Sequence, residues 1–207
     1  MDIDGSLAVK ILGLAGSPRR NGTSENLLDA FLAGAGQGGA ATEKFILAEL
    51  NINACNGCED CLIDGDCPFR DDASELYERL LQADVVVLAA PVYFYSVPAQ
   101  VKLLIDRCQA LWARKYVLRR GPTPDPGRGV IIAVAASKGP KVFDGFLLTV
   151  KYFMDTFDKK INGFLLRRSS NAKGRGDIHE SLMNKAFKLG LGYAQDRDYG
   201  YQEEDHG

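Results

Sequence analysis

The stretch that decides the fold is "DVVVLAAP" at residues 84–91. Between Asp84 and Pro91 every position is apolar, with no alternation of apolar and polar residues. A short continuous apolar run bounded by turn-forming residues is typical of a strand buried on both faces of a sheet. Because such strands occur in parallel sheets covered by helices on both sides, this stretch predicts an α/β protein.

Four more apolar runs and a set of helical periodicities surround this stretch. The runs lie at 7–14, 44–50, 129–137 and 161–166. Helices are expected after Thr23 and Ser24, from a capping box at Asp72 and Glu75, from Pro98 to Trp112, over 143–157, and from about Asp177 and Glu180. Five strands alternating with five helices predict a flavodoxin-like three-layer sandwich, with a parallel sheet of strand order 2-1-3-4-5 and helices on both faces.

Composition indicates one ordinary domain. The chain has 207 residues and a formal net charge of −2, which gives no reason to expect nucleic acid or a membrane surface as partner. We expect the domain over 1–191, with a cysteine-rich insertion at 51–71 and a polar tail over 192–207 that is mobile or reaches another subunit. The acidic start predicts no signal peptide, hence a cytoplasmic protein with reduced thiols, in which disulfides are not expected.

The expected fold places ligands beyond the carboxyl ends of the first and third strands. The loop after the first strand, "GSPRRNGTSENLL" (16–28), combines glycines, hydroxyls, Arg19 and Arg20 with a helix amino terminus, which suits an anion. It matches neither a P-loop nor G-x-G-x-x-G, so a monophosphate is favoured over a pyrophosphate. The alternative is an ordinary polar loop with a Ser/Thr helix cap.

Two further loops belong to the same edge. After the third strand, Tyr93, Phe94 and Tyr95 could line a flat heterocycle, although Tyr95 is expected to pack into the core. After the fourth strand, Ser137 to Gly139 could bond a polar ring edge, as could many loops of this kind.

"GSPRRNGTS", the cysteine loop, "DD" and "ADVVVLAAPVYFYSVPAQVKLLIDR" together resemble the NADPH-dependent FMN reductase family, and within it the iron–sulfur flavoproteins. The resemblance covers roughly the first two-thirds of the chain. It implies an FMN-binding domain in which the phosphate is held by Ser17, Arg19, Asn21, Thr23 and Ser24, the ring is lined by Pro91, Val92, Tyr93 and Phe94, and its pyrimidine edge lies near Ser137, Lys138 and Gly139.

Four of the five cysteines follow the pattern C-x2-C-x2-C-x5-C-P, at Cys55, Cys58, Cys61 and Cys67. Such short steps let a loop wrap a [4Fe–4S] cluster with four thiolates, and the pattern is similar to that of iron–sulfur flavoproteins. Structural zinc is the main alternative, although its sites usually pair two C-x2-C steps across a longer gap; an empty site is the third possibility. The fifth cysteine, Cys108, lies on an apolar helix stripe and is expected to be buried.

Four acids, Glu59, Asp60, Asp64 and Asp66, lie among these cysteines, and no Lys or Arg does. Because reduction adds negative charge to a cluster, acids close to it would give it a low reduction potential.

The expected function is an FMN-dependent oxidoreductase. It would pass electrons between NAD(P)H or a ferredoxin, FMN and a [4Fe–4S] cluster to an unnamed acceptor, with no catalytic side chain required. From the resemblance we expect a homodimer or tetramer. The alternatives are a non-catalytic FMN and iron–sulfur electron carrier, an FMN reductase whose cysteine loop is empty or holds zinc, and a colourless flavodoxin-like binding domain.

Overall fold

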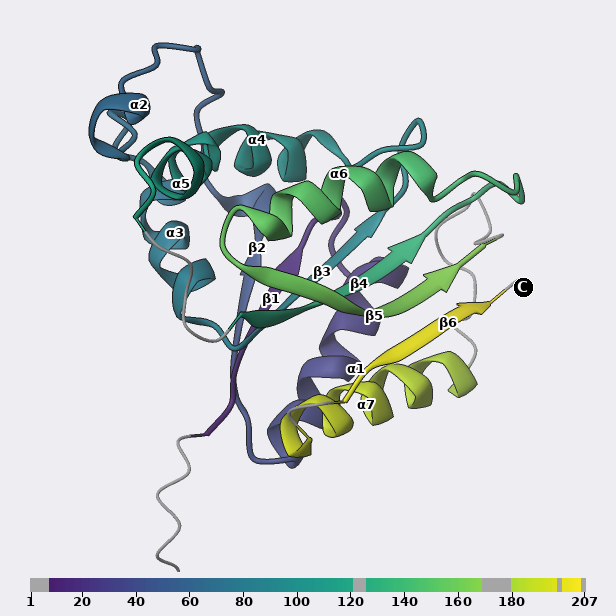
Figure 1. Ribbon diagram of the computed structural model, residues 1–207. Coiled ribbons are helices and arrows are strands. Elements are labelled where there is room, and N and C mark those ends of the chain that lie inside the picture. Colours follow the sequence, from purple (N-terminus) through teal and green to yellow (C-terminus); the bar gives the residue numbers. More distant parts are fainter. Residues whose placement is uncertain (1–7, 121–125, 169–179, 197–198, 206–207) are drawn as a thin grey trace, which may run out of the picture.

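Strands and helices alternate along the chain as the sequence predicts (Figure 1). The computed structural model describes residues 8–120, 126–168, 180–196 and 199–205. The strands are β1 Lys10–Ala15, β2 Ala41–Ile46, β3 Val85–Pro91, β4 Gly127–Val134, β5 Lys159–Arg167 and β6 Tyr201–Asp205. The helices are α1 Thr23–Gln37, α2 Cys61–Asp64, α3 Asp72–Gln82, α4 Ala99–Arg107, α5 Gln109–Trp112, α6 Asp144–Asp155 and α7 Glu180–Gln195, with a 3₁₀ turn η1 Leu47–Glu49 and a π-helical turn η2 Ala113–Val117.

The sheet has the order β2-β1-β3-β4-β5-β6, and every neighbouring pair is parallel. The predicted order 2-1-3-4-5 is therefore confirmed. The expectation of a polar tail from Gly192 that is mobile or reaches another subunit does not hold for residues 192–195 and 201–205. Helix α7 continues to Gln195, and residues 201–205 add the strand β6 beside β5. An edge strand bonds to the sheet on one side only and needs no continuous apolar run, so "YQEED" carries no periodicity that marks it.

Two apolar cores lie on the two faces of the sheet. One forms between the sheet and the helices α3, α4 and α6, and the other between the sheet and the pair α1 and α7 (Figure 1). The pair α1 and α7 cross so closely that a Cβ on Gly34 would lie 1.9 Å from the carbonyl oxygen of Phe187. A Cβ on Gly190 would lie 1.8 Å from the carbonyl oxygen of Phe31. Glycine at both positions is what permits this contact.

Several boundaries differ from the predictions. Helix α3 has Asp71 as its N-cap, whose side chain accepts from the backbone N–H of Ala73, so the expected capping box at Asp72 is not the device used. Helix α7 begins at Glu180, while Asp177 lies outside the described residues. The long helix expected after Pro98 is divided at Cys108, which is 1% exposed, as predicted. Within the described residues, no helix combines the length and the apolar character needed to cross a membrane.

Candidate functional site

The loop between β1 and α1 is polar and lies at the carboxyl edge of the sheet. Ser17 is 6% exposed, and its hydroxyl oxygen accepts the backbone N–H of Arg19 at 3.1 Å. Gly16 donates its N–H to the carbonyl of Ala89, and a Cβ there would meet Val101 at 2.3 Å, so the loop presses against α4. Gly22 is the N-cap of α1 and supplies no side-chain cap. No capping side chain therefore competes with an anion for the N–H groups of the first turn of α1.

A buried carboxylate orders the far side of this loop. Glu25 is 2% exposed and accepts from Lys44 at 2.9 Å, from Arg20 at 3.1 Å and from the backbone N–H of Asn21 at 2.6 Å. Burial alone would raise the pKa of Glu25, but these hydrogen bonds outweigh it and lower the pKa. Arg20 also pairs with Glu49. Arg20 is therefore paired with carboxylates of the protein itself. Arg19, which is exposed, is the arginine of this loop that is better placed to contact a ligand.

Residues 93–96 form a tight two-residue hairpin. Tyr93 and Ser96 exchange both backbone hydrogen bonds at 2.9 Å, and the central residues Phe94 and Tyr95 have φ of 50° and 62°. Positive φ at both central positions favours Asn or Gly, so two aromatic residues there carry backbone strain. Phe94 is 101% exposed and Tyr95 54% exposed. The expectation that Tyr95 packs into the core is therefore wrong, because the turn projects both rings into solvent.

The loop after β4 adjoins this hairpin. A Cβ on Gly139 would lie 3.5 Å from the hydroxyl oxygen of Tyr95, and Ser137 and Lys138 are exposed. Arg168, which follows β5, donates to the carbonyl oxygens of Gly139 at 2.9 Å and Pro140 at 3.1 Å. Sequence reasoning did not single out Arg168, which holds the loop in place. The structure places Thr23 and Ser24 in the first turn of α1, Pro91 at the end of β3, and the other residues on the loops after β1, β3 and β4. The roles toward FMN stay predictions for all twelve residues: Ser17, Arg19, Asn21, Thr23, Ser24, Pro91, Val92, Tyr93, Phe94, Ser137, Lys138 and Gly139.

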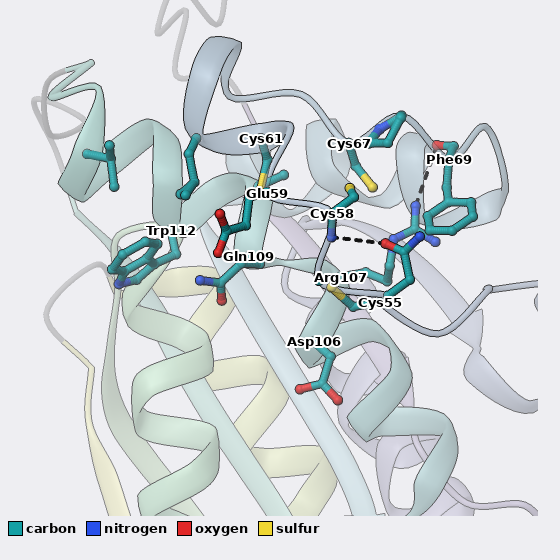
Figure 2. A pocket seen from close by; sticks show the side chains of 16 residues that line it. Cys55, Cys58, Glu59, Cys61, Cys67, Phe69, Asp106, Arg107, Gln109 and Trp112 are labelled. Carbon is teal, nitrogen blue, oxygen red and sulfur yellow. Dashed lines mark hydrogen bonds between the residues drawn. The ribbon is translucent and has the colours of Figure 1, made fainter.

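The four clustered cysteines line one cavity of about 610 Å³ (Figure 2). Cys55 and Cys58 lie on an irregular segment before α2, while Cys61 opens the single turn α2 and Cys67 follows it. Gly65 ends α2 with φ of 83° and donates its N–H to the carbonyl of Cys61 at 3.0 Å. Burial raises the pKa of the Cys61 thiol, and the thiols of Cys67, Cys55 and Cys58 raise it further. The predicted ligands are thus brought to one place.

The cavity fits a guest larger than one ion. Within the described part of the chain, no three His, Cys, Asp or Glu side chains converge on a position for a single metal. Zinc draws four sulfurs to about 2.3 Å from one point, whereas a four-iron cube spaces its thiolates more widely. Four thiols around a common space of this size provide the donor set that a four-iron cube requires.

A buried ion pair closes the stem of the cysteine loop. The guanidinium of Arg107, at the end of α4, donates to the carboxylate of Asp71 at 2.5 Å and to the carbonyl of Asn53 at 3.1 Å. The Arg107 and Asp71 side chains are 0% and 2% exposed. Asp71 also accepts the backbone N–H of Asn53 at 2.9 Å, so residues before and after the loop meet at one carboxylate.

The ion pair fixes the charge of both partners. Burial would raise the pKa of Asp71, but hydrogen bonds from Arg107 and Asn53 lower it to about 2. Burial would lower the pKa of Arg107, but the hydrogen bond to Asp71, with Tyr77 and Cys67 nearby, raises it above its usual range.

Sequence reasoning missed Arg107, although a signal existed. Residues 104, 107, 108 and 111 share one helical stripe, and Leu104, Cys108 and Leu111 are apolar. An arginine on an otherwise buried stripe indicates a buried charge that must have a partner.

Of the four acids in the cysteine loop, Glu59 lines the cavity, whereas Asp60, Asp64 and Asp66 do not. Asp66 pairs instead with Arg114 at 2.5 Å, and Arg114 also donates to the carbonyl of Gly65 at 2.8 Å. The loop itself contains no basic residue, but Arg114 from outside the loop compensates part of its negative charge.

The order and the parallel direction of the strands define a flavodoxin-like α/β protein. The chain belongs to the NADPH-dependent FMN reductase family, whose family model matches residues 9–142. The family recognised from the sequence is thereby confirmed.

Iron-sulfur flavoproteins are among its relatives. One from Archaeoglobus fulgidus is 42% identical over 99 residues, which is 48% of this chain and 45% of the relative. One from Methanocaldococcus jannaschii is 39% identical over 103 residues, covering 50% of this chain and 53% of the relative. The chain thus spans about half the length of the curated relatives it matches.

Solved structures share the fold. An NAD(P)H:quinone oxidoreductase from Methanothermobacter marburgensis has a TM-score of 0.66 at 18% identity, with coverage of 92% of this chain and 99% of that one. An azoreductase from Bacillus anthracis has a TM-score of 0.64 at 17% identity, with coverage of 90% and 99%.

Proposed function

We propose that this chain is an FMN-dependent oxidoreductase that exchanges electrons between FMN and a [4Fe–4S] cluster held by Cys55, Cys58, Cys61 and Cys67. The observation that carries the proposal is the gathering of these four thiols around one cavity in a chain of the FMN reductase family. The names of the archaeal relatives support it. Electrons would come from NAD(P)H or a ferredoxin, and the homodimer or tetramer stays a prediction.

The chain's own residues would bind and orient the cofactors. The first-turn N–H groups of α1, with the hydroxyls of Ser17, Thr23 and Ser24, would hold the phosphate. The strained hairpin at Tyr93 and Phe94 would place an aromatic surface against the ring, and Arg168 would keep the loop at 137–139 beside it. FMN supplies hydride acceptance and single-electron release, and a cluster supplies one-electron transfer.

The test is an air-free preparation assayed for FMN, iron, sulfide and zinc, with visible spectra. We expect FMN and about four irons per chain, a stoichiometry set by the cluster type. Cys58→Ser should lose iron and keep FMN, whereas Cys108→Ala, at a cysteine outside the cavity, should keep both. Iron that is replaced by stoichiometric zinc in the wild type would contradict the cluster, and protein that takes up no FMN would contradict the whole proposal.

Stopped-flow mixing with NADPH separates the enzyme from the non-catalytic carrier. Rapid bleaching of the flavin absorbance is expected for an NADPH-dependent reductase. A flavin that stays oxidised with NADPH and NADH, yet is reduced by a ferredoxin, would identify the carrier.

A further inference from the structure

The base of the cysteine cavity contains a charged group that the cysteine pattern does not account for. We propose that Arg107 is the electrostatic partner of the metal centre: it presents a buried positive charge and a free N–H to the Cys67 side of the cavity, and thereby raises the reduction potential of the bound centre. This inference rests on the proposal that the four thiols hold an anionic metal centre.

The geometry of the guanidinium supports this role. Its terminal nitrogens bond to Asp71, Asn53 and more distantly Phe69, while its Nε is buried and has no hydrogen-bond partner among the described residues. A buried donor without a partner costs free energy that a native structure normally avoids. Arg107 lines the cavity (Figure 2), and Cys67 lies close enough to raise its pKa, so a thiolate there offers an acceptor.

The orientation of the ion pair decides which sign of charge the cavity experiences. Arg107 lines the cavity and Asp71 does not. The pair therefore acts as a dipole with its positive end toward the cavity.

Burial decides which charges around the cavity prevail. Glu59, Asp60, Asp64 and Asp66 are exposed, so water and salt screen them. Asp106, which also lines the cavity, is 46% exposed and pairs with Lys102 at 2.7 Å, so its charge is screened and partly compensated. The Arg107 side chain is 0% exposed, and a buried charge acts through a lower effective dielectric constant. Because reduction of a cluster adds one negative charge, the buried cation stabilises the reduced form and opposes the low potential that the acids alone would produce.

The experiment compares the 207-residue chain with the variants Arg107→Gln, Arg107→Lys and Asp71→Asn, each reconstituted with iron and sulfide without air. The cluster is titrated with dithionite and redox mediators, and its reduction is followed by electron paramagnetic resonance. Arg107→Gln is expected to reduce the ratio of reduced to oxidised cluster at least tenfold at a fixed potential, which for one electron equals a shift of about −59 mV. Arg107→Lys keeps the charge and should shift the ratio less.

The variant Asp71→Asn distinguishes an electrostatic role of Arg107 from a purely structural one. It removes the negative partner, so the ratio should increase, in the direction opposite to Arg107→Gln. A purely structural clamp would be broken by either change, and both shifts would then have the same sign, which would overturn the proposal. The control is Arg114→Gln, at an arginine that bonds the same loop without lining the cavity, and its shift should be smaller than that of Arg107→Gln.

If the wild type forms no cluster, the proposed iron–sulfur function fails, and Arg107 is tested separately through Zn²⁺. Four thiolates around Zn²⁺ also carry net negative charge. Competition with a chelator should show weaker Zn²⁺ binding for Arg107→Gln and tighter binding for Asp71→Asn. Changes of equal sign, or none, would refute the role of Arg107.

Discussion

The Asp71 carboxylate should make the unfolding free energy depend on pH, and substitution of this one residue should remove that dependence. Its pKa is about 2 in the folded chain against 3.8 for an unperturbed Asp. A depressed pKa contributes stability that is complete above the unfolded value and is lost as the pH falls through the folded value. The full difference corresponds to about 2.4 kcal/mol, of which about 2 kcal/mol should be lost by pH 2.

The assay is urea unfolding of metal-free and flavin-free protein between pH 5 and pH 2, followed by circular dichroism. Other carboxylates also titrate, so the measured quantity is the difference in unfolding free energy between the wild type and Asp71→Asn. Asn caps a helix as well as Asp does, so the variant removes the charge and keeps the cap of α3.

We expect this difference to shrink by about 2 kcal/mol from pH 5 to pH 2. Asp72→Asn, at the exposed neighbouring carboxylate that accepts the N–H of Asn51, is the matched control. A difference that is constant across this range, or that grows in acid, would refute the reasoning that the ion pair holds the folded pKa low.

Three further predictions concern other parts of the chain. Gly34→Ala should lower the unfolding free energy in urea by about 1 to 3 kcal/mol, because its Cβ would collide with Phe187. Gly36→Ala, whose Cβ would meet nothing within 4 Å, should raise it by roughly 0.5 to 1 kcal/mol. Equal effects of the two substitutions would contradict the close crossing of α1 and α7. Ser17→Ala should weaken FMN binding about tenfold and leave riboflavin binding unchanged in fluorescence titrations, and equal losses for both ligands would place the phosphate elsewhere. Phe94→Asn should raise the unfolding free energy by about 1 kcal/mol by relieving the positive φ while lowering affinity for FMN, and a loss of stability would show that the turn is unstrained.

The architecture was predictable because it depends on buried apolar runs. The strand at 84–91 is buried along nearly its whole length, and the first five strands take the order that such runs imply. The strand β6 was missed because an edge strand is defined by backbone bonds to one neighbour, which leave no periodic signal in "YQEED".

The candidate site was predictable where one short segment contains all its parts. The cysteine spacing indicated one cavity, and the structure brings those thiols together. Contributions from distant segments were missed: Arg107 lies 40 residues beyond Cys67, and Arg168 reaches the loop at 137–139 from the end of β5. Tyr95 was misplaced because its exposure results from a two-residue turn, and three consecutive aromatic residues do not show which of them the turn projects outward.

Asn53, Asp71 and Arg107 form a stem that joins the two ends of the cysteine loop, so the loop can be replaced as a unit. Its two ends are joined by the protein's own hydrogen bonds, whatever the sulfurs carry. Once such ends are joined, doubling the number of intervening residues adds only about 0.6 kcal/mol of closure entropy. Evolution, or a protein engineer, can therefore lengthen or shorten residues 54–68, or exchange them for a different sequence, while the sheet and its carboxyl edge keep their form.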